Sequence, residues 1–269
     1  MSVIYSDKGQ AMPSGTVKIE EKAFGSVEGT EIRWLSGAGI MINSRGSVIL
    51  IDPLLEGFDM PLLVTAPLST ADVKKADAVL ITHIDNDHYS IPTCQGLRAV
   101  TENFHTTEYV ASEMLKNDIP GKGHKIADEF EAGAVSVKLT PTLHNWQNYM
   151  PDKDREYLPE DYCGFYLHTP DGKIWLPGDS KLLEEQLHME TPDVILFDFS
   201  DNDWHIGFEG AVKLANVYPD AKLICIHWGT VDAPDFTPFN ADPNKLREAV
   251  ENPERVIALC PGEAFTLRA

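Results

Sequence analysis

Short apolar runs separated by glycine, serine and charged residues make up the first part of the chain. Residues 17–24, 30–35, 39–44 and 47–52 each combine β-branched or aromatic residues with intervening turn residues. This spacing predicts antiparallel β-hairpins. The next segment, 69–76, predicts the start of a helix with Ser69 as its N-cap.

Strand and helix patterns alternate through the rest of the chain, which predicts the α/β class. We expect strands at 77–83, 135–144, 193–201 and 222–229, helices at 91–100, 181–189, 208–217 and 244–252, and hairpins at 163–179 and 258–267. Because both halves combine strands with helices, we predict a four-layer αββα sandwich in which two mixed β-sheets pack face to face and helices cover the outer faces.

The length of 269 residues and the hydrophobic content of 43% fit one domain over residues 1–269, with residues 1–15 as an N-terminal arm. The four cysteines are widely spaced and lie in or beside apolar segments, as is typical of reduced cytosolic proteins. The N-terminus has no signal-peptide pattern, and no apolar run reaches 18 residues. We therefore predict a cytoplasmic protein with no membrane association.

A formal charge of −20 argues against electrostatic binding to nucleic acid or to an anionic membrane. It leaves a small-molecule substrate as the expected partner. No heptad repeat or apolar stripe identifies an oligomer interface, and a homo-oligomer is left open.

Polar residues that bind metals stand at the ends of four predicted strands, at His83, His144, Asp179 and His227. The first of these strands continues into the segment ITHIDNDHYS (81–90), which adds further histidine and aspartate side chains: Asp85, Asp87 and His88. So many convergent polar groups would be left unsatisfied unless a cation or a dense hydrogen-bond network received them. The pattern predicts a metal site.

Imidazole and carboxylate ligands together suit zinc, manganese or iron, and a carboxylate between two ions can bridge them. Two neighbouring ions can share a hydroxide and polarise a carbonyl or phosphoryl oxygen. We therefore expect one or two divalent metal ions and a hydrolytic reaction.

The motifs THIDNDH, TLH, PGD and IHWGT resemble those of the metallo-β-lactamase superfamily, whose first motif is HxHxDH and whose fold is an αββα sandwich with a dinuclear site at one edge. The segment GFEGAVKLANVYPDAKLICIHWGT most resembles the branch that includes L-ascorbate-6-phosphate lactonase. The early strand ILIDP, around Asp52, is also similar to one in the superfamily.

The resemblance implies that His83 and His144 bind a first metal, and that Asp179 bridges it to a second. The ligands of the second metal would be Asp87, His88 and His227. Asp85 replaces the second histidine of the motif. As a ligand it would favour manganese or iron over zinc; alternatively, it accepts a hydrogen bond that orients a ligand histidine, and only one metal binds.

For catalysis we expect a metal-activated hydroxide, held near Asp87 and Asp179, to attack the carbonyl of a lactone or ester of a small molecule. Asp87 could also carry the proton to the leaving group. His205 could donate a proton or bind substrate, or be an ordinary loop histidine. The alternatives are a phosphoesterase, a di-iron redox centre, and a non-catalytic metal-binding or sensing protein with an altered first site.

Several further residues have two interpretations. Asp52 could hold a loop amide or the free N–H of a ligand histidine, although a turn before Pro53 is the favoured role. Trp146, Tyr149 and Trp228 could line a pocket or pack in the core. The loop 150–162 could be a lid or a solvated connection. We expect the four remaining histidines to be surface residues: His105, His124, His168 and His188.

Overall fold

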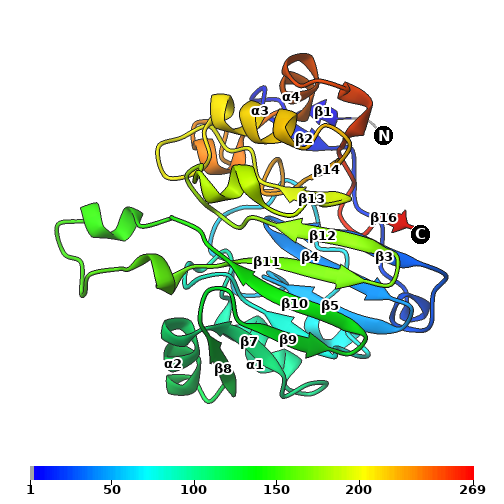
Figure 1. Ribbon diagram of the computed structural model, residues 1–269, viewed down its shortest axis with the longest axis vertical. Helices are drawn as coiled ribbons and strands as arrows, with labels where there is room; N and C mark the ends of the chain where they lie inside the picture. The colour runs from blue at the N-terminus through cyan, green and yellow to red at the C-terminus, as the bar shows by residue number, and fades with distance from the viewer. Residues whose placement is uncertain (1–2) are drawn as a thin grey trace.

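Two seven-stranded β-sheets form the centre of the computed structural model, which describes residues 3–269 (Figure 1). In spatial order, the first sheet consists of β16 (Ala264–Leu267), β3 (Thr30–Ser36), β4 (Gly39–Ser44), β5 (Ser47–Ile51), β6 (Ala78–Leu80), β7 (Phe104–Thr107) and β8 (Gly121–His124). The second consists of β15 (Val256–Ile257), β14 (Lys222–Cys225), β13 (Val194–Phe197), β12 (Gly172–Leu176), β11 (Gly164–Thr169), β10 (Val135–Thr140) and β9 (Glu129–Ala132).

Both sheets are mixed. The hairpin strands β3 to β5 and β9 to β12 are antiparallel, whereas β5 to β8 and β12 to β15 are parallel. Parallel strands in one sheet have their carboxyl ends at the same edge. Polar residues that follow β6, β12, β13 and β14 are therefore brought toward one edge of the molecule.

The central strands of the first sheet, β4 to β7, are buried on both faces. Ile40 and Ile42 of β4 belong to the core between the two sheets, whereas Met41 between them belongs to the core under the helices. This alternation follows from the two-residue period of a strand. It explains why the run from Ile40 to Ile42 is apolar throughout rather than alternating with polar residues.

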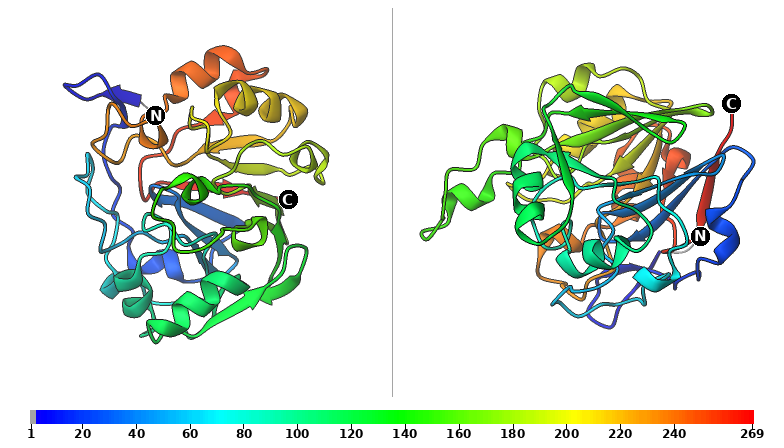
Figure 2. Two further views of the ribbon diagram at one scale, coloured as in Figure 1. Left: turned by 90° about the vertical axis from the view of Figure 1, so that its left-hand side faces the viewer. Right: turned by 90° about the horizontal axis from the view of Figure 1, so that it is seen from below.

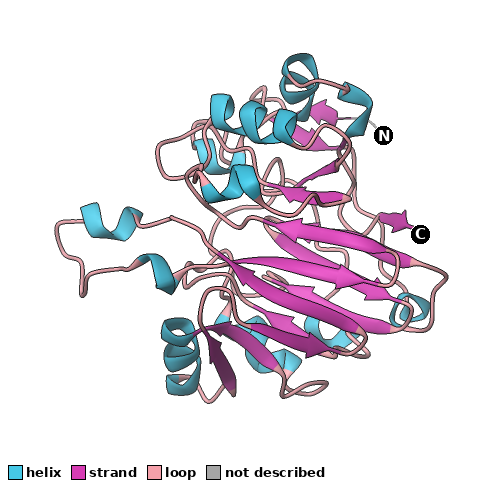
Figure 3. Cartoon of the chain, in the orientation of Figure 1, coloured by secondary structure: helices cyan, strands magenta, loops and turns pink. Residues whose placement is uncertain are grey.

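Helices cover the outer face of each sheet, which completes the four layers (Figures 2 and 3). Helices α1 (Ile91–Leu97) and α2 (Glu108–Lys116) pack on the first sheet, and α3 (Phe208–Val217) and α4 (Pro243–Ala249) pack on the second. The predicted αββα sandwich is confirmed. Short 3-10 turns complete the fold: η1 (Glu21–Phe24), η2 (Thr70–Asp72), η3 (Trp146–Tyr149), η4 (Pro159–Asp161), η5 (Glu185–His188), η6 (Thr237–Phe239) and η7 (Pro253–Arg255).

The N-terminal segment forms a small sheet of its own from β1 (Val3–Tyr5) and β2 (Ala11–Pro13). Gln10 links this small sheet to the rest of the molecule, because its buried side-chain amide donates hydrogen bonds to the carbonyls of Val231 and Phe239. The four cysteines form no disulfide. Within residues 3–269, no helix is long and apolar enough to cross a membrane.

Four predicted elements were wrong. Residues 17–24 contain no strand, and only Glu21–Phe24 form a regular element, η1, because consecutive charged residues break the alternation. Residues 69–76 and 181–189 contain single 3-10 turns instead of α-helices. Residues 258–267 do not form a hairpin, since β15 and β16 join different sheets. Strand β16 pairs with β3 and satisfies the backbone groups of that edge.

Candidate metal centre

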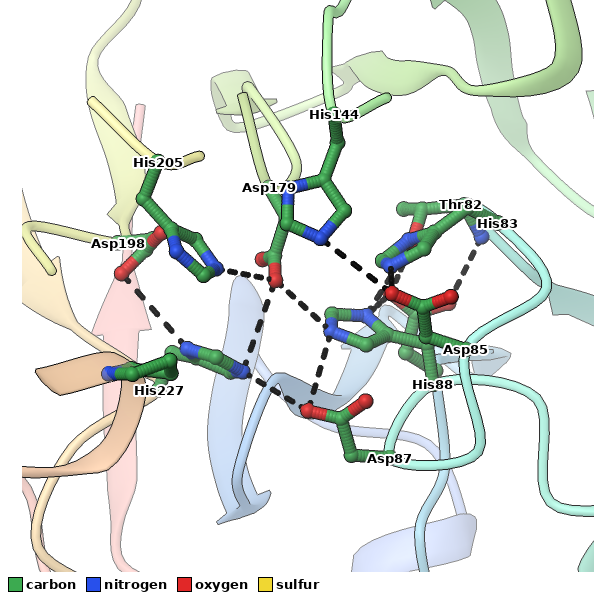
Figure 4. A network of polar contacts seen from close by, with 12 residues as sticks. Thr82, His83, Asp85, Asp87, His88, His144, Asp179, Asp198, His205 and His227 are labelled. Carbon is green, nitrogen blue, oxygen red and sulfur yellow. Dashed lines mark hydrogen bonds and ion pairs between the residues drawn. The ribbon is translucent and has the colours of Figure 1, made fainter. Parts of the chain in front are cut away.

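Histidines and aspartates from both sheets meet at one edge of the sandwich (Figure 4). Each follows the carboxyl end of a strand within the next few residues, and the loop after β6 supplies four of them. The residues brought together are His83, Asp85, Asp87 and His88 after β6, His144 after β10, Asp179 after β12, Asp198 and His205 after β13 and His227 after β14.

A first set of donor atoms consists of His83 Nε2, His144 Nε2 and Asp85 Oδ2. Asp85 Oδ2 lies 3.4 Å from the nitrogen of His83 and 3.3 Å from that of His144. Two ligands of a tetrahedral zinc-like ion are roughly 3.3 Å apart, given metal–ligand distances near 2.0 Å. His83 Nε2 is buried and has no hydrogen-bond partner. These atoms are spaced and directed as ligands of one cation.

A second set consists of Asp87, His88 and His227, with Asp179 beside it. Asp87 Oδ2 lies 3.7 Å from His88 Nε2 and 3.2 Å from His227 Nε2. Asp179 Oδ2 lies 3.2 Å from His88 Nε2 and 3.7 Å from His227 Nε2. Asp179 also groups with His83 and His144, so its carboxylate stands between the two sets. That is the position a bridging ligand requires.

Three of the histidines turn Nε2 into the centre because Nδ1 is held elsewhere. His83 Nδ1 lies 2.9 Å from Thr82 Oγ1, and His144 Nδ1 donates to the carbonyl of Trp204 at 2.9 Å. His88 Nδ1 lies 2.8 Å from Asp52 Oδ2. Such contacts fix the ring orientation and the tautomer of a metal ligand.

Asp52 therefore does more than form a turn before proline. It is fully buried, and Oδ1 accepts from the Thr82 backbone N–H at 2.8 Å while Oδ2 accepts from Thr82 Oγ1 at 2.6 Å. With the contact to His88, it holds both a loop amide and a ligand histidine. Its backbone has a left-handed φ of 43°, and so does that of His227 at 60°. Non-glycine residues in this conformation are strained and are common at functional sites.

The carboxylates raise the pKa of His88, His144 and His227 in the metal-free site, whereas burial lowers that of His83. Burial alone would lower the pKa of His227, but Asp179, Asp87 and Asp198 raise it to about 9. For His88, burial is likewise outweighed by Asp179, Asp87 and Asp52, which raise its pKa well above the usual value. Burial would raise the pKa of Asp179, but the surrounding histidines hold it well below the usual range. The centre is built to hold positive charge.

Asp85 is held by two donors from η3, directly after His144. Trp146 Nε1 donates to Oδ2 at 2.7 Å, and Gln147 Nε2 donates to Oδ1 at 2.6 Å. Tyr162 in turn donates to Gln147 Oε1 at 2.7 Å. Asp85 thus faces two ligand nitrogens while both of its oxygens are hydrogen-bonded, which fits an oriented ligand carboxylate.

His205 contacts the shared carboxylate from the opposite side. Its Nε2 lies 2.9 Å from Asp179 Oδ2, and Asn202 holds its Nδ1 at 2.8 Å. In the neutral tautomer with the proton on Nε2, His205 donates to Asp179 and accepts from the Asn202 amide. The structure therefore places His205 beside the site, as predicted.

Asp198 was not among the residues predicted from the sequence. Ser200 donates to Asp198 Oδ1 through both its N–H and its hydroxyl. Asp198 Oδ1 lies 3.8 Å from His227 Nδ1, and neither that nitrogen nor Asp198 Oδ2 has a hydrogen-bond partner. The signal was present in the sequence, because Asp198 directly follows an apolar strand, as His83 and His227 nearly do.

Comparison with known proteins agrees with this arrangement. The model of the beta-lactamase superfamily domain matches residues 47–228, more than half of the chain. The chain belongs to this family. A UPF0173 metal-dependent hydrolase of Archaeoglobus fulgidus is 26% identical over 245 residues, which cover 87% of this chain and 98% of the relative.

Solved structures share the fold at lower identity. A possible metal-dependent hydrolase from Veillonella parvula superposes with a TM-score of 0.70 at 20% identity, covering 89% of this chain and 100% of the other. An isothiocyanate hydrolase from Delia radicum gut bacteria also has a TM-score of 0.70 at 20% identity, covering 89% and 99%. These neighbours confirm the architecture of the family.

The remaining histidines do not contribute to the centre. His168 and His188 are exposed as predicted, and they pair with Glu190 and Glu184. His105 is buried, so its prediction as a surface residue was wrong, and His124 is only partly exposed. The two rings are hydrogen-bonded at 2.9 Å and stack with Phe130 from the second sheet, a long-range contact that local sequence does not reveal.

A cavity of about 630 Å³ opens over the metal centre. Its floor includes Asp85, Asp87, His144, Asp179, His205 and His227. Trp146 lines the wall, whereas Trp228 is buried and stacks on Trp34 in the core. The volume is typical of a site for a small molecule.

Proposed function

We propose that this protein is a metal-dependent hydrolase that opens a lactone or ester of a small molecule. The observation that carries the proposal is the pair of adjacent donor sets sharing Asp179 at the floor of a cavity of about 630 Å³. The names of the relatives, metal-dependent hydrolase and isothiocyanate hydrolase, support it.

Two divalent ions fit the donors. His83, Asp85 and His144 would hold the first, and Asp87, His88 and His227 the second, with Asp179 between them. Bound ions of this kind supply an acidified water and positive charge opposite a carbonyl oxygen. Because Asp85 adds a carboxylate where the family motif has histidine, we expect a preference for manganese or iron over zinc.

The side chains around the donors handle protons and orientation. Asp87 lines the cavity, so it is placed to carry a proton from the attacking water to the leaving oxygen. His205 donates to Asp179 and fixes the direction of that carboxylate, while its own ring is held by Asn202. No serine or cysteine nucleophile lies among the residues that line the cavity, which fits direct attack by water.

The resemblance to L-ascorbate-6-phosphate lactonases supports carbonyl chemistry in particular. The cavity offers no cationic side chain to a phosphate group, because no lysine or arginine lines it. We therefore place lactones and esters ahead of phosphoesters.

The test is turnover of matched lactones, carboxylic esters, thioesters and phosphoesters by protein loaded separately with manganese, iron and zinc. We expect lactone or ester cleavage, which Asp87→Asn should reduce on the order of 100-fold, as expected for a general acid–base group. His205→Ala should also reduce it, because this substitution removes the hydrogen bond that directs Asp179. Cleavage of phosphoesters alone would replace this function with a phosphoesterase. Bound metal without turnover of any class would favour the non-catalytic interpretation.

A further inference from the structure

We propose that the substrates are esters or lactones that carry an apolar group of aromatic size and no phosphate or carboxylate. This substrate class rests on the proposed hydrolytic function. It follows from the side chains above the metal centre, which no motif predicts.

One wall of the cavity is a continuous aromatic track that begins at a ligand. The ring of Phe239 lies 5.2 Å from the ring of His227, and the rings of Phe236 and Phe58 lie 5.6 Å and 6.2 Å from that of Phe239. Phe236 is 52% exposed, so the track runs from the centre to the surface. A buried ring in contact with an imidazole ligand gives an apolar substituent a place next to the reacting carbonyl.

A second group of aromatic side chains, Trp146 and Trp204, also lines the cavity. The hydrogen bond from Trp146 Nε1 to Asp85 holds that indole against the centre. Trp204 packs against Tyr149 with ring centroids 4.7 Å apart, which joins the loop after His144 to the loop before α3. Met60 and Met150 complete the apolar lining, and methionine adapts to groups of different shape. These side chains give the cavity an aromatic and apolar lining suited to a flat apolar group.

The charges at the cavity oppose a negatively charged substrate. No lysine or arginine lines it, whereas Asp59 and Asp203 do, and neither carboxylate makes a hydrogen bond or an ion pair with any described residue. Two basic residues of adjoining segments have partners of their own: the ammonium of Lys181 lies over the Trp204 ring, 4.7 Å from its centroid, and Arg155 pairs with Asp161 at 2.9 Å. A phosphate or carboxylate on the part of the substrate that lies away from the metals would lose hydration without gaining a lysine or arginine partner.

Hydrolysis converts an uncharged substrate into a negatively charged product in this acidic cavity. The oxygen of water forms a bond to the carbonyl carbon, the bond from that carbon to the leaving oxygen breaks, and the leaving oxygen takes up a proton. The remaining proton of the water is released to solvent near neutral pH, so an uncharged ester or lactone becomes a carboxylate, with or without a separate alcohol. The product acquires a negative charge beside Asp59 and Asp203, and like-charge repulsion then favours its release.

The experiment compares two 4-nitrophenyl esters of nearly equal size, those of (4-methylphenyl)acetic acid and (4-carboxyphenyl)acetic acid, with the metal-loaded protein. We expect kcat/KM to be at least about 30-fold higher for the uncharged ester, since like-charge juxtaposition costs several kcal/mol. Asp203→Lys should lower the ratio of the two kcat/KM values about tenfold. Asp235→Lys, an exposed position that does not line the cavity, should leave the ratio unchanged.

Calorimetric titration with the corresponding anilides separates this proposal from the proposed function. Failure of both esters to turn over, with binding of the uncharged anilide and none of the charged one, would overturn hydrolysis and support the substrate class. Hydrolysis of both esters at equal rates, or a preference for the charged one, would overturn the substrate class and leave hydrolysis standing. The substrate class would also be overturned if the charged anilide bound at least as tightly as the uncharged one.

Discussion

Two clusters of buried histidines lie at different edges of this molecule, and burial affects their protons in opposite ways. In the metal centre, the pKa of His227 is raised to about 9. In the pair formed by His105 and His124, burial, His124 and Lys122 lower the pKa of His105 to about 4. Both rings are at most 7% exposed, so exposure does not explain the difference.

The difference lies in the carboxylates. Asp179, Asp87 and Asp198 surround His227, whereas the ring of His105 meets another imidazole and the ring of Phe130. A buried imidazole loses its proton unless anionic groups stabilise the charge. Groups that hold a proton on a ring can equally hold a metal ion beside it; carboxylates raise the pKa of His227, whereas none contributes to the shift of His105.

The largest expected effect is on the shared ligand. Asp179→Ala should remove both metals and all activity, because this carboxylate lies between the two donor sets. Elemental analysis should show a change from near two ions per chain to none. Asp235→Asn, an exposed carboxylate outside the cavity, is the matched control and should retain both ions. Two ions retained by Asp179→Ala would contradict the bridging position.

A substitution at Asp85 separates the two metal positions. Asp85→Ala should lose the first ion and keep the second, which has its own ligands. Asp85→His should restore two ions and shift the preference toward zinc, since imidazole replaces a carboxylate. Competition between manganese and zinc, followed by mass spectrometry of the protein, measures both changes. An unchanged metal content in Asp85→Ala would show that this carboxylate is not a ligand.

Substitution of a residue that donates a hydrogen bond to Asp85 should have a smaller effect on metal binding. Trp146→Phe keeps an apolar ring but removes the N–H that lies 2.7 Å from Asp85 Oδ2. Loss of such an orienting contact typically weakens metal binding by about tenfold or more. Titration of the metal-free protein with manganese should show this for one ion only. Trp204→Phe, which makes no hydrogen bond to a ligand carboxylate among the described residues, should leave both affinities unchanged.

Metal binding should release protons at neutral pH. Because Asp179 and its neighbours raise the pKa of His227 to about 9, its ring carries a proton at pH 7 in the metal-free protein, and a metal must displace it. Metal affinity should therefore rise with pH from 7 to about 9 and level off above. Titration in weakly buffered solution should show proton release at pH 7 and less at pH 10. Equal release at both values would contradict the assignment.

The smallest expected effect is on the pH dependence of stability, through the pair of His105 and His124. The folded pKa of His105, about 4, lies below its ordinary value of 6.5, so the unfolded chain binds the proton more tightly between these values. Stability should be fully present above pH 6.5 and fall as the pH drops toward 4, by about 1 kcal/mol or roughly 3 °C. His105→Phe should flatten this part of the profile in thermal unfolding, whereas His168→Gln, at an exposed position, should not.

The success of the sequence-based predictions depended on how local the signal was. The convergence of polar residues at strand ends was predictable because each follows its own apolar run, and the same reasoning applied to β13 would have found Asp198. The role of Asp52 depends on Thr82 and His88, which are distant in the sequence. The pairing of β16 with β3 and the stacking of His105 on Phe130 also depend on long-range contacts. Single-sequence patterns do not specify such partners.

The most direct test of the account is the metal content of the purified protein, measured by elemental mass spectrometry beside Asp179→Ala and His105→Phe. We predict about two divalent ions per chain in the wild type, none in Asp179→Ala and two in His105→Phe. No more than trace metal in the wild type after incubation with manganese, iron or zinc, or two ions in Asp179→Ala, would contradict the assignment of a metal centre to this edge of the sandwich.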